Sequence, residues 1–128
     1  FSDAQTVSLG SELSVVEKYL SIQQMRFGEK LTYQVDCHTE AQIPPMIIQP
    51  LVENCIKHNI DFTEHLHIDL KITNENGQVV ITILDSQAIL NPAMLDKGVG
   101  LTVTRRRVEY LGGIFLIKNG GIEISFKS

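Results

Sequence analysis

The sequence has few cysteines, little net charge and no long apolar run. Two cysteines in 128 residues, Cys37 and Cys55, fall on a predicted strand and on the apolar side of a predicted helix. They are expected to be small buried hydrophobic residues in a reducing compartment, not a disulfide or a metal pair. The net charge of −4 offers no basic surface for nucleic acid or a membrane. No apolar run approaches the roughly 20 residues of a membrane helix, and no signal-peptide pattern opens the chain.

What remains is an ordinary globular composition. With 43% hydrophobic and 20% charged residues, a chain of this length can form one domain with a sizeable core. It begins at Phe1 without a methionine, which indicates a piece of a longer protein. Motifs, and not composition, must therefore point to the function.

The stretch Q-P-L-V-E-N-C-I-K-H-N, from Gln49 to Asn59, predicts an amphipathic helix. Pro50 suits its first turn, where a missing N–H costs nothing. A carboxylate and an amide oxygen on the polar side can bind a hard cation or a water, and an ammonium and an imidazole can face phosphates. An ordinary helix with a solvated face and one i,i+4 ion pair fits the same pattern. At about 100° per residue, the polar side carries Glu53, Asn54, Lys57 and His58, and the apolar side carries Leu51, Val52, Cys55 and Ile56.

The string P-P-M-I-I-Q-P-L-V-E-N-C-I-K-H, from Pro44 to His58, resembles the N box of the GHKL ATP-binding fold. That fold is shared by histidine kinases, type II topoisomerases, Hsp90 and MutL. Within it, the wording resembles the LytS-like sensor histidine kinases, whose N box is usually P-P-x-x-x-Q-P-L-V-E-N-A-x-K-H-G. The resemblance implies that Asn54 ligates Mg²⁺, that Glu53 acts as a base or organises water and metal, and that Lys57 and His58 face the phosphates of ATP.

A helix is also predicted near the start of the chain. Ser8 can cap it, it extends from about Leu9 to Phe27, and Gly28 ends it. The family's linker helix reads L-x-x-E-L-x-x-x-x-x-Y-L-x-I-x-x-x-R-F, so the resemblance implies that residues 1–28 lead out of a missing dimerisation and phosphoacceptor region, with the ATP-binding domain at 29–128. The predicted apolar stripe is Leu9, Leu13, Val16 and Leu20, widened by Val15, Tyr19 and Ile22; the matches to the family are Leu9, Glu12, Leu13, Tyr19, Leu20, Ile22, Arg26 and Phe27.

Alternating apolar residues predict strands in the rest of the chain. Asn76-Gly77 is a strong hairpin signal, because both central residues of a type I′ turn need positive φ. The order of elements is α+β, and the resemblance implies a two-layer sandwich of the GHKL (Bergerat) type: a mixed sheet with helices on one face, preceded by the linker helix. His58, His65 and His67 match no usual zinc spacing. Predicted strands span 31–37, 66–73, 78–85, 114–118 and 122–127.

Two further boxes of the family are altered in this chain. Asp85 takes the place of the aspartate in D-x-G-x-G, whose carboxylate accepts a hydrogen bond from the adenine amino group. Gln87 and Ile89 replace both glycines of that box, which let the backbone approach the nucleotide. Residues 86–97 then correspond to the ATP lid, with an apolar composition.

The G-x-G-L box comes next, before a helix expected to end at Leu111. A helix N-terminus favours phosphate oxygens, so the resemblance implies that Gly98, Gly100 and Leu101 bind the nucleotide. Val103 replaces the asparagine of this box, and Arg107 takes the position of its arginine.

The leading hypothesis is therefore the catalytic domain of a LytS-like sensor histidine kinase, with ATP and Mg²⁺ as cofactors. It implies γ-phosphoryl transfer to an upstream histidine and on to a response regulator, in a homodimeric protein whose upstream segments anchor it in the inner membrane and whose catalytic domain is cytoplasmic. No histidine of the chain lies in the family's H-F-x-F-N-x-L setting, so the fragment alone is not expected to autophosphorylate. The alternative is a degenerate GHKL module that has lost nucleotide and relays signals. A GHKL hydrolase fits the linker helix and N-box wording poorly.

Overall fold

The computed structural model describes residues 6–85, 99–118 and 120–127, and for 99–101 only the backbone. Its main sheet has five strands in the order β2-β4-β5-β7-β6. The β2–β4 pair is parallel, whereas the other pairs are antiparallel, so the sheet is mixed as predicted. The strands are β2 (Leu31–Cys37), β4 (Leu66–Glu75), β5 (Gln78–Asp85), β6 (Ile114–Lys118) and β7 (Gly121–Lys127).

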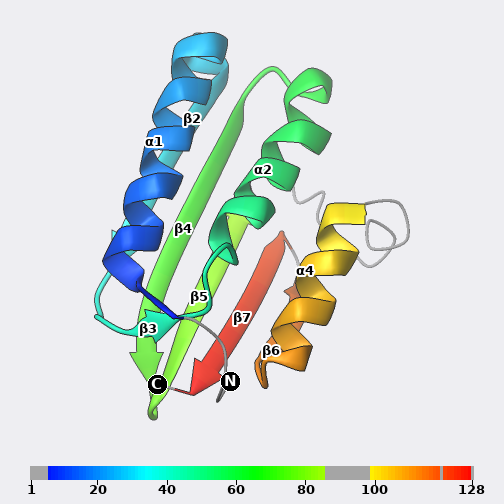
Figure 1. The fold of residues 1–128 in the computed structure, drawn as a ribbon. Helices are drawn as coiled ribbons and strands as arrows, with labels where there is room; N and C mark the ends of the chain where they lie inside the picture. Colours follow the sequence, from blue (N-terminus) through cyan, green and yellow to red (C-terminus); the bar gives the residue numbers. More distant parts are fainter. Residues whose placement is uncertain (1–5, 86–98, 119, 128) are drawn as a thin grey trace.

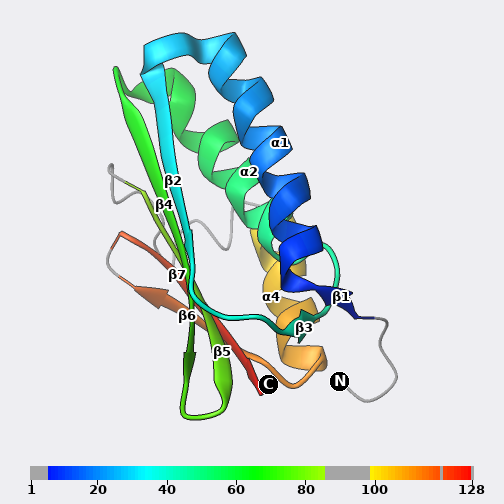
Figure 2. The ribbon, with the colours of Figure 1, turned by 90° about the vertical axis from the view of Figure 1, so that its left-hand side faces the viewer.

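Three helices of the described chain cover one face of this sheet: α1 (Leu9–Phe27), α2 (Ile48–Asn59) and α4 (Val99–Tyr110). Figure 2 shows sheet and helices as two layers, and Figure 1 shows α2 between α1 and α4. Two single turns of 3-10 helix, η1 (Gly28–Lys30) and η2 (Ile60–Phe62), follow α1 and α2. The predicted α+β sandwich is confirmed.

The first helix has the predicted bounds and caps. The Ser8 hydroxyl accepts a hydrogen bond from the Ser11 amide at 3.1 Å, and Gly28 ends the helix with a φ of 61°. The prediction that Val15 and Ile22 belong to the apolar stripe of this helix is wrong, because their side chains are 49% and 61% exposed. Both lie on the side of α1 that faces away from the sheet, since they fall more than about 100° from the stripe's centre.

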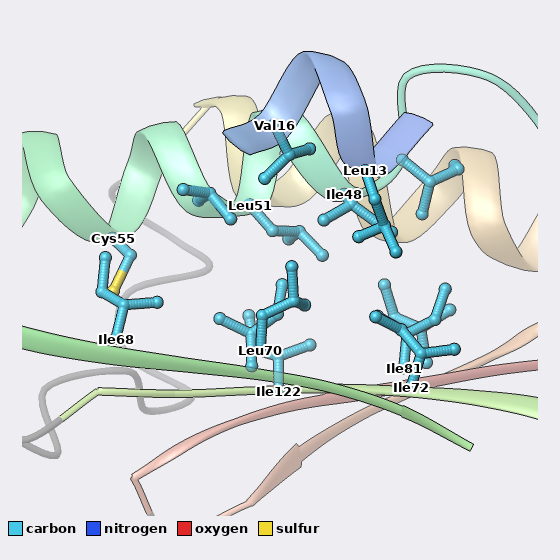
Figure 3. Packing of buried hydrophobic residues seen from close by; sticks show 14 of the residues in the cluster. Leu13, Val16, Ile48, Leu51, Cys55, Ile68, Leu70, Ile72, Ile81 and Ile122 are labelled. Carbon is cyan, nitrogen blue, oxygen red and sulfur yellow. The ribbon is translucent and has the colours of Figure 1, made fainter. Parts of the chain in front are cut away.

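The core lies between the helix layer and the sheet (Figure 3). Burial of aliphatic side chains on both layers supplies the main driving force for this packing, roughly 25 cal/mol per Å² of apolar surface. Because α1 belongs to the same hydrophobic cluster as the sheet, it packs as part of one body with it. The labelled side chains are Leu13 and Val16 of α1, Ile48, Leu51 and Cys55 of α2, and Ile68, Leu70, Ile72, Ile81 and Ile122 of the sheet.

The β4–β5 hairpin turns where the sequence predicts it. Asn76 and Gly77 have φ values of 55° and 78°, as a type I′ turn requires. The next hairpin, β6–β7, turns at Gly120 with a φ of 84°. A two-stranded sheet of β1 (Val7–Ser8) and β3 (Gln42–Ile43) was not predicted, because two-residue strands carry no periodicity.

Cys37 corrects a second expectation, because its side chain is exposed. It is the last residue of β2, and β2 is an edge strand of the sheet. The described sheet has no further strand beside β2, and β2 ends at Cys37. The side chain of Cys37 therefore lies outside the core, although the alternation of apolar residues predicts that it points inward. Cys55, by contrast, is buried as predicted.

Candidate functional site

The N-terminus of α2 is held by a residue of α1. The N-cap position is Ile47, which has no side-chain acceptor. The carboxylate of Glu12 takes this role: its Oε1 accepts from the amide of Met46 at 3.1 Å, and its Oε2 accepts from those of Ile47 and Ile48 at 2.9 and 3.0 Å. A carboxylate satisfies the orphan donors there and complements the helix dipole. Sequence reasoning placed Glu12 only by resemblance, since its partners lie more than 30 residues away.

Glu53 and Lys57 lie on the flank of α2 that faces α1. They line a cleft of about 410 Å³ between the two helices. Among the described residues the partner of the Glu53 carboxylate is the Gln49 amide, at 3.1 Å, and not the ammonium of Lys57. Other residues lining the cleft are Tyr19, Gln23, Arg26, Phe27, Ile56, Ile60 and Asp61.

The Glu53 carboxylate affects the pKa of Tyr19, which lies across this cleft. Burial raises the pKa of the Tyr19 phenol, the Glu53 carboxylate raises it further, and the Arg26 guanidinium lowers it. A negative charge near a phenol disfavours the phenolate, so the direction follows from Coulomb's law. The direction of this shift agrees with the position of Glu53 opposite Tyr19 in the cleft.

Asn54 and His58 lie on the other flank of α2. They are one turn apart, and Asn54 is rotated about 100° from Glu53. Both are half-buried, and neither lines the cleft beside α1. Figure 1 shows α4 on the side of α2 away from α1. The four polar residues of the N box thus divide into two pairs instead of forming one cluster.

Asp85 ends β5 and is only 6% exposed. It lies opposite Ile68 in the antiparallel β4–β5 ladder, and directly opposed residues point to the same face of a sheet. Ile68 points toward Cys55 of α2 in Figure 3. The Asp85 carboxyl therefore faces the helix layer at α2, as the predicted adenine-reading residue must.

Cys55 lies near this carboxyl, and Asn59 is one turn further along α2. Burial, and secondly the charge of Asp85, raise the pKa of the Cys55 thiol to about 12. Asn59 is fully buried, and its Nδ2 donates to the Cys55 carbonyl at 2.7 Å. No partner for the buried Asn59 Oδ1 lies in the described part of the chain, and such an acceptor costs about 1–3 kcal/mol. The resembled N box has alanine and glycine at these two positions.

The remaining predicted site residues are only partly described. Gly98 and the lid, 86–97, lie outside the described residues, as do Gln87 and Ile89. Gly100 and Leu101 lie in the first turn of α4, which begins at Val99. The helix therefore begins within the glycine box, at Val99, and ends at Tyr110, one residue before the expected Leu111.

Two histidines, His65 and His67, have structural partners. Thr32 Oγ1 lies 3.1 Å from His65 Nε2 and 2.7 Å from His67 Nδ1, and His67 Nε2 lies 3.2 Å from Asp69. Nowhere in the described chain do three His, Cys, Asp or Glu residues gather in a way that could hold a metal ion. None of its described helices has the length and apolar character needed to cross a membrane.

Comparison with known proteins identifies the fold. No family model matches the chain. It is similar to the catalytic domain of histidine kinase ThkA, with a TM-score of 0.67, 15% identity and coverage of 95% of this chain and 93% of that one. Histidine kinase AdeS of Acinetobacter baumannii gives a TM-score of 0.74 and 15% identity, over 96% of this chain and 66% of that one. The chain has the fold of a histidine kinase catalytic domain.

A curated relative adds support from sequence. Sensor protein kinase HptS of Staphylococcus aureus (strain USA300) is 34% identical over 88 residues, which are 66% of this chain and 17% of that protein. The matched part of this chain thus spans a small part of the relative's length. The chain is thus similar in sequence to a sensor protein kinase and similar in fold to histidine kinase catalytic domains.

Proposed function

We propose that this chain is the ATP-binding catalytic domain of a LytS-like sensor histidine kinase. One observation carries the proposal: a buried carboxyl, Asp85, faces α2 at the end of β5, on a histidine kinase fold. The activity is transfer of the ATP γ-phosphoryl to a histidine of an upstream dimerisation region, and from there to a response regulator. Homodimerisation and a membrane anchor belong to that upstream part.

The N-box residues take different roles in this proposal. Asn54 offers an amide oxygen to Mg²⁺, and His58, on the same flank, faces the phosphates. Lys57, which is exposed at the mouth of the cleft beside α1, has to extend its long side chain across α2 to reach them. When bound, the magnesium ion neutralises phosphate charge and helps align the γ-phosphoryl with its acceptor. Glu53 lines the cleft that faces α1, so in this proposal it acts on the nucleotide only indirectly. The first turn of α4, with Gly100 and Leu101, follows Gly98 and supports the phosphates.

A specific observation favours a second candidate function, a relay module without nucleotide. Cys55 lies near Asp85, and Asn59 is fully buried and donates to the Cys55 carbonyl. The resembled N box has alanine and glycine at these positions, so this chain carries larger side chains near the proposed adenine acceptor. In this second function, the domain transmits the position of its helices to a partner without phosphoryl transfer.

Calorimetric titration with a non-hydrolysable ATP analogue, with and without Mg²⁺, decides between these functions. Magnesium-dependent binding at micromolar to sub-millimolar Kd, roughly −8 to −5 kcal/mol, supports the kinase. A folded sample, verified by circular dichroism, that gives no heat up to millimolar analogue contradicts the kinase function and supports the relay module.

A further inference from the structure

A single peptide group joins the three helices of the described structure. It lies between Met46 and Ile47, directly before α2. Its N–H, from Ile47, donates to Oε2 of Glu12 on α1 at 2.9 Å. Its C=O, from Met46, accepts from Nη1 of Arg107 on α4 at 2.8 Å. A carboxylate and a guanidinium thus hold the two ends of one amide.

This arrangement is electrostatically cooperative. Both hydrogen bonds involve an ionised partner, which shortens and strengthens them. A carboxylate at the N–H and a guanidinium at the C=O polarise the amide in the same direction, so each bond strengthens the other. The Glu12 side chain is only 6% exposed, so water screens its bonds little. Loss of either charged residue therefore weakens the bond made by the other.

The backbone at this point depends on those bonds. Met46 has a φ of 58°, a left-handed conformation that a residue with a Cβ adopts at a cost of roughly 1–2 kcal/mol. Glu12 compensates for it by accepting from Met46 as well as from Ile47 and Ile48. The conformation persists because α1 and α4 hold it from two sides.

We propose that Glu12 and Arg107 are positioning residues, and that the Met46–Ile47 peptide couples the position of α1 to those of α2 and α4. This inference concerns the coupling itself, and its functional meaning rests on the proposed function. In that function α1 leads from the upstream signalling region, α2 carries Asn54, and α4 begins within the glycine box. A shift of α1 then moves both helices that border the nucleotide.

The first test is a double-mutant cycle in urea on the 128-residue chain. Glu12→Gln is expected to raise the unfolding equilibrium constant at least tenfold in the wild type, but less than threefold in an Arg107→Gln background. If Glu12→Gln raises the equilibrium constant by the same factor in both backgrounds, Glu12 and Arg107 are not coupled and the proposal is overturned. Glu17→Gln and Arg106→Gln, at exposed positions of α1 and α4, are the matched controls and are expected to be additive.

The second test separates coupling from simple capping of α2. Hydrogen exchange of the Glu12→Gln variant is expected to be at least fivefold faster both at residues 46–48 and in α4, over 102–110. A mere cap accelerates only 46–48 and the first turn of α2, and that result overturns the proposal. If Glu12→Gln fails to fold, Arg107→Gln tests the same coupling from α4. Hydrogen exchange is then expected to be faster at residues 46–48 and in the first turns of α1. Unchanged exchange at these residues overturns the proposal.

Neither test uses nucleotide, so both remain decisive if the domain binds none. Absence of heat in the titration contradicts the kinase function alone. An additive cycle, or exchange confined to 46–48, contradicts the coupling alone. Where nucleotide does bind, Glu12→Gln is expected to weaken the analogue's affinity at least threefold while Glu17→Gln leaves it unchanged; equal affinities would show that the coupling does not reach the nucleotide.

Discussion

Glu53 and Asn54 are neighbours in the sequence, yet their side chains lie on different flanks of α2. Glu53 lines the cleft against α1, whereas Asn54 is rotated about 100° away from it. In the proposed function, the Asn54 flank serves the nucleotide site with Asp85 and α4, and the Glu53 flank does not. The two residues should therefore respond differently to mutation.

Asn54→Ala is expected to weaken magnesium-dependent binding of an ATP analogue at least tenfold, since it removes the amide oxygen proposed for Mg²⁺. Stability to urea should change by less than about 1 kcal/mol, because the side chain is half-buried and outside the hydrophobic cluster. Calorimetric titration measures the first effect. The matched control is Asn74→Ala, at an exposed position near the β4–β5 turn; equal affinities of the two variants would exclude the metal role.

Glu53→Gln is expected to lower the pKa of Tyr19, since the Glu53 carboxylate contributes to raising it. Burial remains in the variant, so the pKa should stay above its ordinary value. Ultraviolet absorbance of tyrosinate, followed against pH in a background with Tyr33→Phe and Tyr110→Phe, measures the change. Nucleotide affinity should stay within about threefold of the same background. A large loss of nucleotide affinity would instead indicate that Glu53 acts on the metal ion or on a water molecule.

Combining Cys55→Ala with Asn59→Gly is expected to tighten binding of the ATP analogue about tenfold or more. These substitutions shorten the side chains near Asp85 and match the resembled N box. An Asp85→Asn change added to the pair should abolish the gain, since the carboxylate is the proposed acceptor for adenine. If the double variant binds the analogue no more tightly, these two side chains do not limit binding. Gln87→Gly combined with Ile89→Gly then tests whether the missing glycines limit it.

The two cysteines should differ sharply toward a thiol reagent. Cys37 is exposed and Cys55 is buried, so one thiol should react rapidly and the second only on unfolding. Mass spectrometry after alkylation, with Cys37→Ser as control, gives the count and the site. Two fast thiols in the folded protein would contradict the position of Cys55.

Cys55 also gives stability a dependence on alkaline pH. Its pKa is raised from 9.0 to about 12 in the fold, so above pH 9 the unfolded chain releases a proton that the folded chain keeps. The free energy of unfolding should therefore fall by up to about 1.4 kcal/mol per pH unit between these values. Urea unfolding of the wild type against Cys55→Ala isolates this contribution, because the other titrating groups are common to both. Parallel pH curves would show that the thiol does not contribute.

The sequence predicted what depends on local periodicity and turn chemistry. The α1 bounds, the strand alternation and the Asn76-Gly77 turn follow from neighbouring residues, and the structure confirms them. The helix α2 begins at Ile48, so Pro50 lies in its first turn as predicted. Its first amides are satisfied by Glu12, which no local pattern indicates.

The candidate site was predicted less completely, for a related reason. A helical wheel shows a polar side of α2 but not which helix lies beside each flank, so the separation of Glu53 from Asn54 required the packing of α1. The burial of Asn59, one turn after Cys55, likewise depends on how α2 lies over β4 and β5. The edge position of β2, which exposes Cys37, depends on strand order and is absent from any single strand's alternation.

The connection into α2 has consequences for folding. Pro44 and Pro45 each fix a φ angle, and Met46 then adopts a φ of 58°. The prolines restrict the unfolded chain, so ordering this segment loses less conformational entropy than ordering an average loop would. A glycine at position 46 would relieve the native strain but add freedom to the unfolded ensemble. This segment thus combines a restricted unfolded state with one unfavourable angle, and the three hydrogen bonds to Glu12 stabilise its native geometry.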